Sequence, residues 1–303
     1  MRHAALVVNP VSGQRRGEAI GEVATRRLRD ASWTIDRVTG DDVPAVRSSL
    51  RTLLEAGADT VVVIGGDGAL HGILDLVVEF DATLGLVPAG TGNDLARGLD
   101  LPYRDPEACL DLLLASPPRR IDLARVDDGQ HRRLVATVVA SGFDSKVNER
   151  ANAMTWPRGN LRYTIAILAE LRAFAPVPFC LELVDAAGQT RRVDTEAMLV
   201  AVGNGPSFGG GLRIAHGAVL DDGLLDVCLI RPVSRSLLVR TFPKLRRGTH
   251  VSLREFERLM VRSVRVDAPD IVGYGDGERL GPLPVTIEVV PRALAVLAPA
   301  RVG

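Results

Sequence analysis

Strand-like and helix-like segments alternate through the first 115 residues of the chain. Short apolar runs that end in glycine, proline or polar residues are expected to form buried strands. The expected strands are residues 4–8, 33–38, 60–64 and 83–87. Helices are expected at residues 17–28, 43–55, 69–78, 91–98 and 107–114. Apolar strands that alternate with helices are typical of a parallel sheet covered on both faces, so we predict an α/β domain over residues 1–122.

The pattern changes near Pro117 and Pro118, after which β-rich runs predominate. Strands are expected at residues 134–140, 177–184, 197–202, 224–230, 263–266 and 285–290, and helices at 161–174 and 234–245. This half of the chain, residues 123–292, is predicted to be a β-sandwich or a similar antiparallel domain with inserted helices. The last strand-like stretch, residues 293–298, could return to either domain.

Composition limits the classes of partner. The 303 residues include 37 Lys and Arg against 37 Asp and Glu, and 24% of the residues are charged. These values argue against extensive disorder and against bulk electrostatic binding to nucleic acid. Lys146 and Lys244 are the only lysines, so any protein cation beside a phosphate is expected to be an arginine.

Cysteine use and hydropathy favour a cytoplasmic protein. The three cysteines lie far apart and offer neither a paired zinc spacing nor a disulfide framework, which favours a reducing compartment. The apolar run at residues 4–8 is too short for a signal peptide, and nowhere do eighteen apolar residues follow one another. We therefore expect no transmembrane segment, and any membrane contact is expected to be peripheral.

The strongest local motif is Gly65-Gly66-Asp67-Gly68, at the turn from a buried strand into a helix. Glycines let the backbone approach a ligand closely, and the free amides of a following helix favour an anion. We interpret the loop as a phosphate cradle, although a tight turn with glycine used only for its conformation is the alternative. Asp67 would repel a phosphate unless Mg²⁺ lay between them or its carboxylate acted on a hydroxyl being phosphorylated; a plain helix cap is the simpler reading.

Two further polar loops follow expected strands. Gly90-Thr91-Gly92-Asn93-Asp94 follows the strand at 83–87, and Asn9-Pro10-Val11-Ser12-Gly13 follows the first strand. Parallel strands end at the same edge of a sheet, where open α/β sheets bind their ligands. Thr91 can donate a hydroxyl to phosphate and Asp94 can bind a nucleotide or a metal, whereas Asn93-Asp94 could also be an ordinary helix start.

The common nucleotide-binding signatures are absent. The chain has no Gly-x-x-x-x-Gly-Lys-Ser/Thr sequence and lacks the protein-kinase set of motifs. It also has no Gly-x-Gly-x-x-Gly after the first strand, which weakens a dehydrogenase interpretation.

The three glycine loops, in this order and at these spacings, make the chain resemble the diacylglycerol kinase catalytic-domain family. That family includes soluble bacterial diacylglycerol kinases, YegS-type lipid kinases, and sphingosine and ceramide kinases. The resemblance extends over nearly the whole chain, and the stretch from Gly142 to Tyr163 looks most like the actinobacterial diacylglycerol kinases. It implies a nucleotide-binding domain of the phosphofructokinase and NAD-kinase type and a C-terminal β-sandwich, with residues 293–303 returning to the first domain. It also implies that ATP, Mg²⁺ and a lipid headgroup meet between the two domains.

Site residues follow from this resemblance where the motifs match. Glu278, in Gly275-Asp276-Gly277-Glu278, matches the proton acceptor, with Asp67 as the second candidate. Asp222 matches the carboxylate of a structural Mg²⁺ site, with Val219 and Leu224 as ligands through their backbone carbonyls. Positions that match ATP contacts are Asn9, Thr39, Gly65, Gly66, Asp67, Gly68 and Thr91.

Physical reasoning adds charge neutralisation to this picture. Mg²⁺ on Asp67 or Asp94 would offset the charge of the β- and γ-phosphates, and Arg97 or Arg162 would supply a protein cation. Taken without the resemblance, the turns that contain Glu278 and Asp222 are more often ordinary solvated hairpins.

The chain departs from the family pattern beside the first glycine loop. Ala69 stands where threonine often follows Gly-Gly-Asp-Gly, and His71-Gly72 replaces a frequent Asn-Glu pair. The first change removes one hydroxyl contact to nucleotide, and the second removes a carboxylate that could serve a second metal or an ion pair.

We predict an ATP- and Mg²⁺-dependent lipid kinase of phospholipid biosynthesis that converts diacylglycerol to phosphatidic acid at a membrane surface. The alternatives are a kinase of the same fold that acts on a sphingoid base or a soluble hydroxyl compound, and a catalytically idle nucleotide-binding regulator. Membrane contact is expected either around Trp156 and the helix that follows it or at the basic cluster of Lys244, Arg246 and Arg247. The first segment could equally be a packed core helix with two exposed arginines, and a basic cluster such as the second is usually only a solvated helix end. A homodimer is a further partner to consider.

Overall fold

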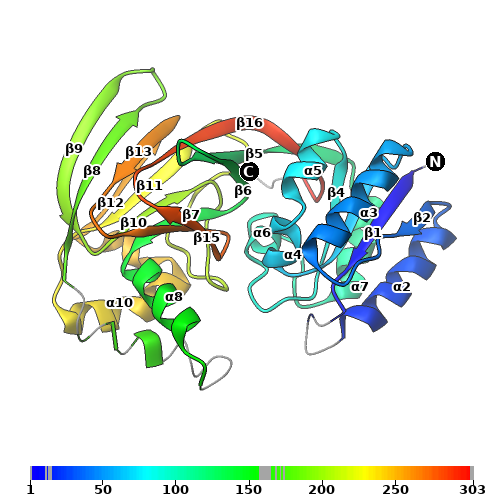
Figure 1. Ribbon diagram of the computed structural model, residues 1–303, viewed down its shortest axis with the longest axis horizontal. Coiled ribbons are helices and arrows are strands. Elements are labelled where there is room, and N and C mark those ends of the chain that lie inside the picture. The colour runs from blue at the N-terminus through cyan, green and yellow to red at the C-terminus, as the bar shows by residue number, and fades with distance from the viewer. Residues whose placement is uncertain are drawn as a thin grey trace.

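The protein consists of two lobes joined by strands that run through both (Figure 1). The computed structural model describes residues 2–10, 12, 16–156, 165–167, 169, 170, 172 and 175–300. The expected helix at 161–174 therefore falls largely outside the described residues.

The first lobe is the predicted α/β domain. Its parallel strands lie in the order β2-β1-β3-β4, with Val62 and Val63 of β3 fully buried at the centre. The strands are β1 (His3–Val8), β2 (Thr34–Arg37), β3 (Thr60–Gly65) and β4 (Thr83–Pro88). The helices are α2 (Gly17–Asp30), α3 (Val43–Glu55), α4 (Asp67–His71), α5 (Leu74–Glu79), α6 (Asp94–Gly98) and α7 (Pro106–Ala115).

Local signals explain several of these boundaries. The Asp42 side chain accepts a hydrogen bond from the Ala45 amide at the start of α3, and Asp105 does the same for α7. The single helix predicted at residues 69–78 is wrong, because the structure has two helices with a break at Gly72 and Ile73. Arg47 donates a hydrogen bond to the Gly72 carbonyl oxygen, and glycine is a poor helix former. The break is consistent with both features.

The second lobe is an antiparallel β-sandwich. One sheet has the order β12-β11-β10-β7-β14-β15, and the other contains β6, β5, β16, β13, β8 and β9. A continuous apolar core lies between the sheets and includes Phe179, Leu181, Val227 and Ile287. The strands are β5 (Pro118–Asp127), β6 (Arg132–Val135), β7 (Val138–Gly142), β8 (Val177–Val184), β9 (Thr190–Ala197), β10 (Leu199–Gly203), β11 (Leu225–Ile230), β12 (Phe256–Val261), β13 (Ser263–Asp267), β14 (Val272–Gly275), β15 (Glu278–Pro282) and β16 (Val285–Leu297).

The last strand joins the lobes. β16 pairs with β13 of the sandwich through residues 285–288, and Ala295 and Val296 pair in parallel with β4. β5 lies antiparallel to β16 along most of its length. The runs predicted separately at 285–290 and 293–298 are thus one strand, with an irregularity around Arg292, whose φ is +53°. Figure 1 shows β16 arching from one lobe to the other.

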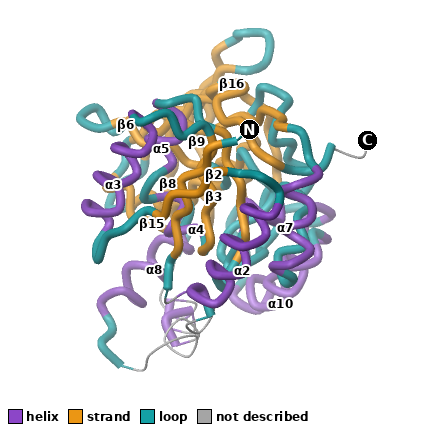
Figure 2. Tube along the Cα trace, turned by 90° about the vertical axis from the view of Figure 1, so that its right-hand side faces the viewer, coloured by secondary structure: helices purple, strands orange, loops and turns teal. Residues whose placement is uncertain are grey.

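Helices cover the lower side of the sandwich lobe in both views. These helices are α8 (Phe143–Ala153) and α10 (Arg235–Arg247), and a short 3-10 helix, η1 (Thr249–Ser252), follows α10 (Figures 1 and 2). α8 was not predicted. Among the described residues, no helix combines the length and the apolar character needed to cross a membrane.

Candidate active site

The described parts of the three glycine loops lie at one edge of the parallel sheet, and of the loop after β1 these parts are Asn9, Pro10 and Ser12. They follow β1, β3 and β4, which are hydrogen-bonded neighbours running in the same direction. The Asn9 amide donates to the Ile64 carbonyl oxygen, and the Ala89 amide donates to the Gly65 carbonyl oxygen. Thr39 follows β2 at the same edge, and its amide donates to Ser49 Oγ. The sequence predicted that these residues lie at the same edge of the sheet, here called the rim, and they do so in the structure.

The loops Gly65–Gly68 and Gly90–Asp94 pack so closely that side chains would not fit. A Cβ atom at Gly90 would lie 2.5 Å from Gly66 Cα, and one at Gly92 would lie 2.4 Å from Asp67 Oδ2. Asn93 closes the turn: its side-chain oxygen accepts from the Gly90 amide, and its amide donates back to the Gly90 carbonyl. Asn93 adopts a left-handed conformation that asparagine tolerates. Glycine at residues 66, 90 and 92 therefore sets the shape of the rim.

Asp67 lies at the meeting point of these loops. Its Oδ1 accepts a hydrogen bond of 2.8 Å from the Asp94 amide. Burial, reinforced by the negative charges of Asp94 and Asp276, raises the pKa of Asp67 to about 6. This carboxyl group is therefore partly protonated near neutral pH and would bind a proton or a cation readily.

Asp94 connects the two lobes. Its side chain is 4% exposed, and its Oδ1 accepts from Ser207 Oγ and the Gly211 amide while Oδ2 accepts from the Gly210 amide. These donors belong to the loop between β10 and β11 of the sandwich. Both carboxylate oxygens are thus used in holding that loop against the α/β lobe, a role that the sequence reasoning did not assign to Asp94.

The sandwich lobe contributes a hairpin, β14–β15, that extends to the first glycine loop. Its two turn residues, Asp276 and Gly277, have φ values of +51° and +89°, as a type I′ turn requires. Glu278 follows this turn on the exposed surface, and a Cβ atom at Gly68 would lie 3.4 Å from its Oε1. Glu278 thus lies next to Gly68 although the two residues belong to different lobes, an arrangement consistent with the role that the family resemblance implies for Glu278.

Asp276 fixes the hairpin to its own lobe. Its carboxylate accepts hydrogen bonds from the Ala136 and Thr137 amides, both 2.8 Å long, and from Thr137 Oγ1. These residues form the turn between β6 and β7, which is why the single strand predicted at residues 134–140 is two strands.

His71 reaches the same place from the α/β lobe. Its Nδ1 is buried, lies 3.8 Å from Asp276 Oδ2 and has no hydrogen-bond partner among the described residues. The carboxylate of Asp276, with a smaller contribution from Glu278, raises the pKa of His71. The histidine that replaces the family's frequent asparagine is therefore packed against the hairpin of the other lobe rather than being a solvated surface group.

The candidate phosphate-binding arginines differ in what the structure shows. Arg97 lies over the Tyr103 ring at 3.8 Å, and its Nε donates to the Gly92 carbonyl oxygen. It therefore supports the second glycine loop directly. Arg162 lies outside the described residues.

The predicted structural magnesium site lies on the loop that precedes β11. Asp222 Oδ1 accepts from the Leu224 amide at 3.0 Å, and burial, with the charges of Asp226, Asp122 and Asp221, raises the pKa of Asp222. In the described part of the chain no three His, Cys, Asp or Glu side chains are grouped as a metal site. A cation there would need the carbonyl oxygens of Val219 and Leu224, as the resemblance implied.

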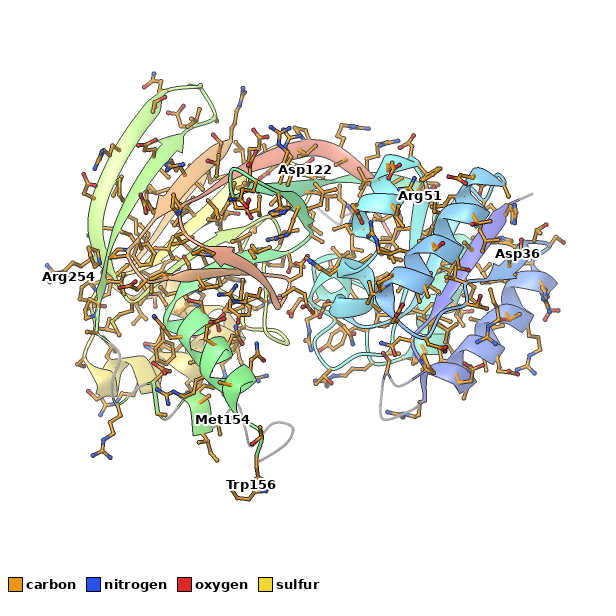
Figure 3. The ribbon with its side chains drawn as sticks, in the orientation of Figure 1. Asp36, Arg51, Asp122, Met154, Trp156 and Arg254 are labelled. Atoms are coloured by element: carbon orange, nitrogen blue, oxygen red, sulfur yellow. The ribbon has the colours of Figure 1, made fainter. Side chains whose placement is uncertain are left out.

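Three contacts between the lobes were missed by sequence reasoning. Asp122, on β5 where the lobes meet (Figure 3), accepts from the Gly223 and Arg292 amides at 2.7 Å. Asn204 donates to the carbonyl oxygens of Asp122 and Ala136. The third is the loop that binds Asp94; its consecutive glycines, residues 209–211, all have positive φ and were the one visible signal.

Family models match both halves of the chain. A diacylglycerol kinase catalytic domain matches residues 3–126, and a YegS C-terminal NAD kinase beta sandwich-like domain matches residues 137–298.

Relatives match nearly the full length. A diacylglycerol kinase of Mycobacterium tuberculosis is 40% identical over 294 residues, covering 97% of this chain and 94% of the relative. A protein named "Probable lipid kinase YegS-like" in Stenotrophomonas maltophilia is 28% identical over 274 residues, with 87% and 86% of the two chains covered. A crystal structure of a diacylglycerol kinase of Bacillus anthracis superposes with a TM-score of 0.71 at 17% identity, covering 98% of this chain and 97% of the other, and shares its fold. The chain is an enzyme of the diacylglycerol kinase and YegS-like lipid kinase family.

Proposed function

We propose that the protein transfers the γ-phosphoryl group of ATP to the hydroxyl of diacylglycerol and so forms phosphatidic acid. The observation that carries this proposal is the meeting of Glu278 from the sandwich lobe with Gly65–Gly68 of the α/β lobe. The 40% identity to a mycobacterial diacylglycerol kinase supports the choice of acceptor.

The glycine loops are suited to hold the phosphates of ATP. Because Gly66, Gly90 and Gly92 have no side chains and pack closely, backbone peptide groups line this rim. Asn9, Thr39 and Thr91 stand at the ends of neighbouring strands and are proposed to bind the rest of the nucleotide. Arg97 keeps the Gly92 carbonyl in place, so the loop is shaped before ATP arrives.

The acids of the site need a cation partner in the reaction. The pKa of Asp67 is already raised, because the carboxyl group is buried and Asp94 and Asp276 add negative charge beside it. The residues fit Mg²⁺, which when bound would neutralise charge on the β- and γ-phosphates. Asp67 is the proposed contact to it, since both oxygens of Asp94 accept hydrogen bonds from the sandwich loop.

Glu278 is the proposed general base. The acceptor oxygen forms a bond to the γ-phosphorus, the bond from that phosphorus to the bridging oxygen breaks, and ADP leaves with that oxygen. The proton of the acceptor hydroxyl passes to Glu278 and then to solvent, to which Glu278 is exposed. Asp67 would take this role only if Glu278 faced away from the acceptor.

Membrane contact is proposed for the lower side of the sandwich lobe. Trp156 is 79% exposed and lies, with Met154, at a tip that projects from the lobe (Figure 3). α10 has no acidic residue, and Arg240, Arg246 and Arg247 are exposed on it. An exposed tryptophan and a basic helix on the same side of the lobe suit the interface of an anionic bilayer, where the lipid acceptor resides. Peripheral association, a cytoplasmic location and a homodimer stay predictions.

A product assay tests this proposal. The protein is incubated with Mg²⁺, ATP labelled on the γ-phosphate, and micelles that contain diacylglycerol, sphingosine or no lipid. Label in phosphatidic acid is the expected result. Label in a sphingoid phosphate would show that the acceptor is a sphingoid base instead of diacylglycerol. ATP hydrolysis without a phosphorylated lipid would overturn the proposal.

A further inference from the structure

The hairpin that carries Glu278 presents two different faces. Tyr274 pairs with Arg279 across β14 and β15, and Gly275 pairs with Glu278 one position nearer the turn. Successive side chains on a strand point to opposite faces, so Tyr274 and Arg279 share one face while Glu278 projects from the other. A group that holds the first face therefore fixes the direction of Glu278 without touching it.

Glu149 of α8 holds that first face. Its Oε1 accepts a hydrogen bond of 2.5 Å from the Tyr274 hydroxyl and one of 2.9 Å from Arg279 Nε. Asn152, one turn further along α8, donates to the Tyr274 hydroxyl at 3.4 Å. One carboxylate oxygen thus connects both strands of the hairpin to the helix.

The surroundings make this contact more than a surface ion pair. Tyr274 is 3% exposed, and burial followed by its hydrogen bond to Glu149 raises its pKa to about 12. A buried hydroxyl that lost its acceptor would be left unsatisfied, which costs free energy. Lys146, on the same helix, donates to the Asp270 carbonyl at the base of the hairpin. α8 therefore holds the hairpin at its base and near its tip.

We propose that Glu149 is a positioning residue for phosphoryl transfer. It acts through Tyr274 and Arg279 and keeps Glu278 directed at Gly68, where the acceptor hydroxyl would meet the γ-phosphate. Because the hydrogen bonds of Asp276 to residues 136 and 137 already hold the turn, Glu149 is not needed for the hairpin to form. Glu149 instead sets the angle at which the hairpin leaves the sandwich lobe. This inference rests on the proposed function, since it concerns the direction in which the side chain of the proposed base, Glu278, points.

The first test is Glu149→Gln, which keeps the size of the side chain and removes its charge. We expect kcat to fall about tenfold, since small misplacements of a reacting group are costly, with the KM for ATP unchanged within about twofold. Tyr274→Phe should lower kcat in the same way. The matched control is Asp194→Asn, which breaks the exposed Arg192–Asp194 pair on β9 and should leave kcat unchanged.

The second test distinguishes an effect of Glu149 on the position of Glu278 from an effect on the stability of the whole protein. Glu149→Gln is introduced into the wild type and into the Glu278→Ala variant, and the fold-loss in kcat that it causes is compared between the two backgrounds. If Glu149 acts through Glu278, the added loss should largely disappear in that background. An equal loss in both backgrounds would show that Glu149 acts elsewhere and overturn the inference.

Hydrogen exchange gives a readout that does not depend on turnover. Amides of residues 272–282 should exchange faster in Glu149→Gln, while those of β3 and β4 should not change. Unchanged exchange in the hairpin overturns this inference alone. Unchanged turnover in Glu278→Ala instead overturns the proposed function, so the two failures are distinguishable.

Discussion

Glu278 of the sandwich lobe and Gly68 of the α/β lobe are in contact range: a Cβ atom at residue 68 would lie 3.4 Å from Glu278 Oε1. The two residues lie far apart in the sequence and meet because β5 and β16 run through both lobes. The reactive arrangement thus depends on how the lobes are held together.

Adding one methyl group at Gly92 should disturb this arrangement. In Gly92→Ala the new Cβ would lie 2.4 Å from Asp67 Oδ2, so the Asp67 carboxylate must move. We expect kcat to fall at least about tenfold. Gly205→Ala is the control, because its Cβ would meet Leu220 and Thr137 only at 3.5 Å and should cost little. Equal activity of the two variants would contradict the placement of Asp67 at the reacting centre.

The raised pKa of Asp67 predicts a pH effect on stability without nucleotide or metal. The folded pKa, about 6, lies above the ordinary value of 3.8, so the fold favours the protonated carboxyl. The stability that this preference contributes is complete below about pH 4 and is lost as the pH rises through about 6. Relative to Asp67→Asn, the wild-type free energy of unfolding should therefore fall by up to about 3 kcal/mol between pH 4 and 7. Denaturant titrations at several pH values measure this difference, and a constant difference would contradict the shift.

Asp94 should contribute to stability more than to turnover chemistry. Asp94→Ala leaves the Ser207 hydroxyl and the amides of Gly210 and Gly211 without their shared acceptor. The free energy of unfolding should fall by about 3 kcal/mol. Glu278→Ala, at an exposed position, should change it by less than about 0.5 kcal/mol. Urea unfolding of the two variants checks the contrast, which would fail if both were equally stable.

The tip at Trp156 predicts a lipid-surface effect. Trp156→Ala should weaken binding to phosphatidylglycerol-containing vesicles several-fold, and added salt should weaken the wild type further because α10 is basic. Vesicle sedimentation measures both effects. Val43→Ala removes an exposed hydrophobic side chain of the α/β lobe and should leave binding unchanged. If the two variants bound alike, the tip would not be the docking surface.

The α/β lobe was predictable because its signals are local. Buried strands end in glycine loops, and parallel pairing then places Asn9, Gly65 and Gly90 on one rim without knowledge of distant contacts. The fold class, α/β domain plus β-sandwich, is confirmed. The position of Glu278 required the family resemblance, since a type I′ turn at Asp276-Gly277 is in itself an ordinary hairpin.

The features that were not predicted depend on contacts between residues far apart in the sequence. β5 was not predicted, because its start at Pro118, Arg119 and Arg120 resembles a linker and its strand structure depends on pairing with β16 and β6. The bridging of the lobes by Asp94 depends on a loop more than a hundred residues later. Glu149 shows no pattern in sequence at all, because its partners lie on a different element.

The rate of phosphoryl transfer from ATP to diacylglycerol in Glu278→Gln decides whether Glu278 is the general base. We expect kcat to fall at least about a hundredfold, with ATP affinity within about threefold of wild type, because the glycine rim is untouched. Glu196→Gln, an exposed glutamate on β9, should behave as wild type. Wild-type turnover in Glu278→Gln, or loss of ATP affinity in place of turnover, would show that Glu278 is not the general base.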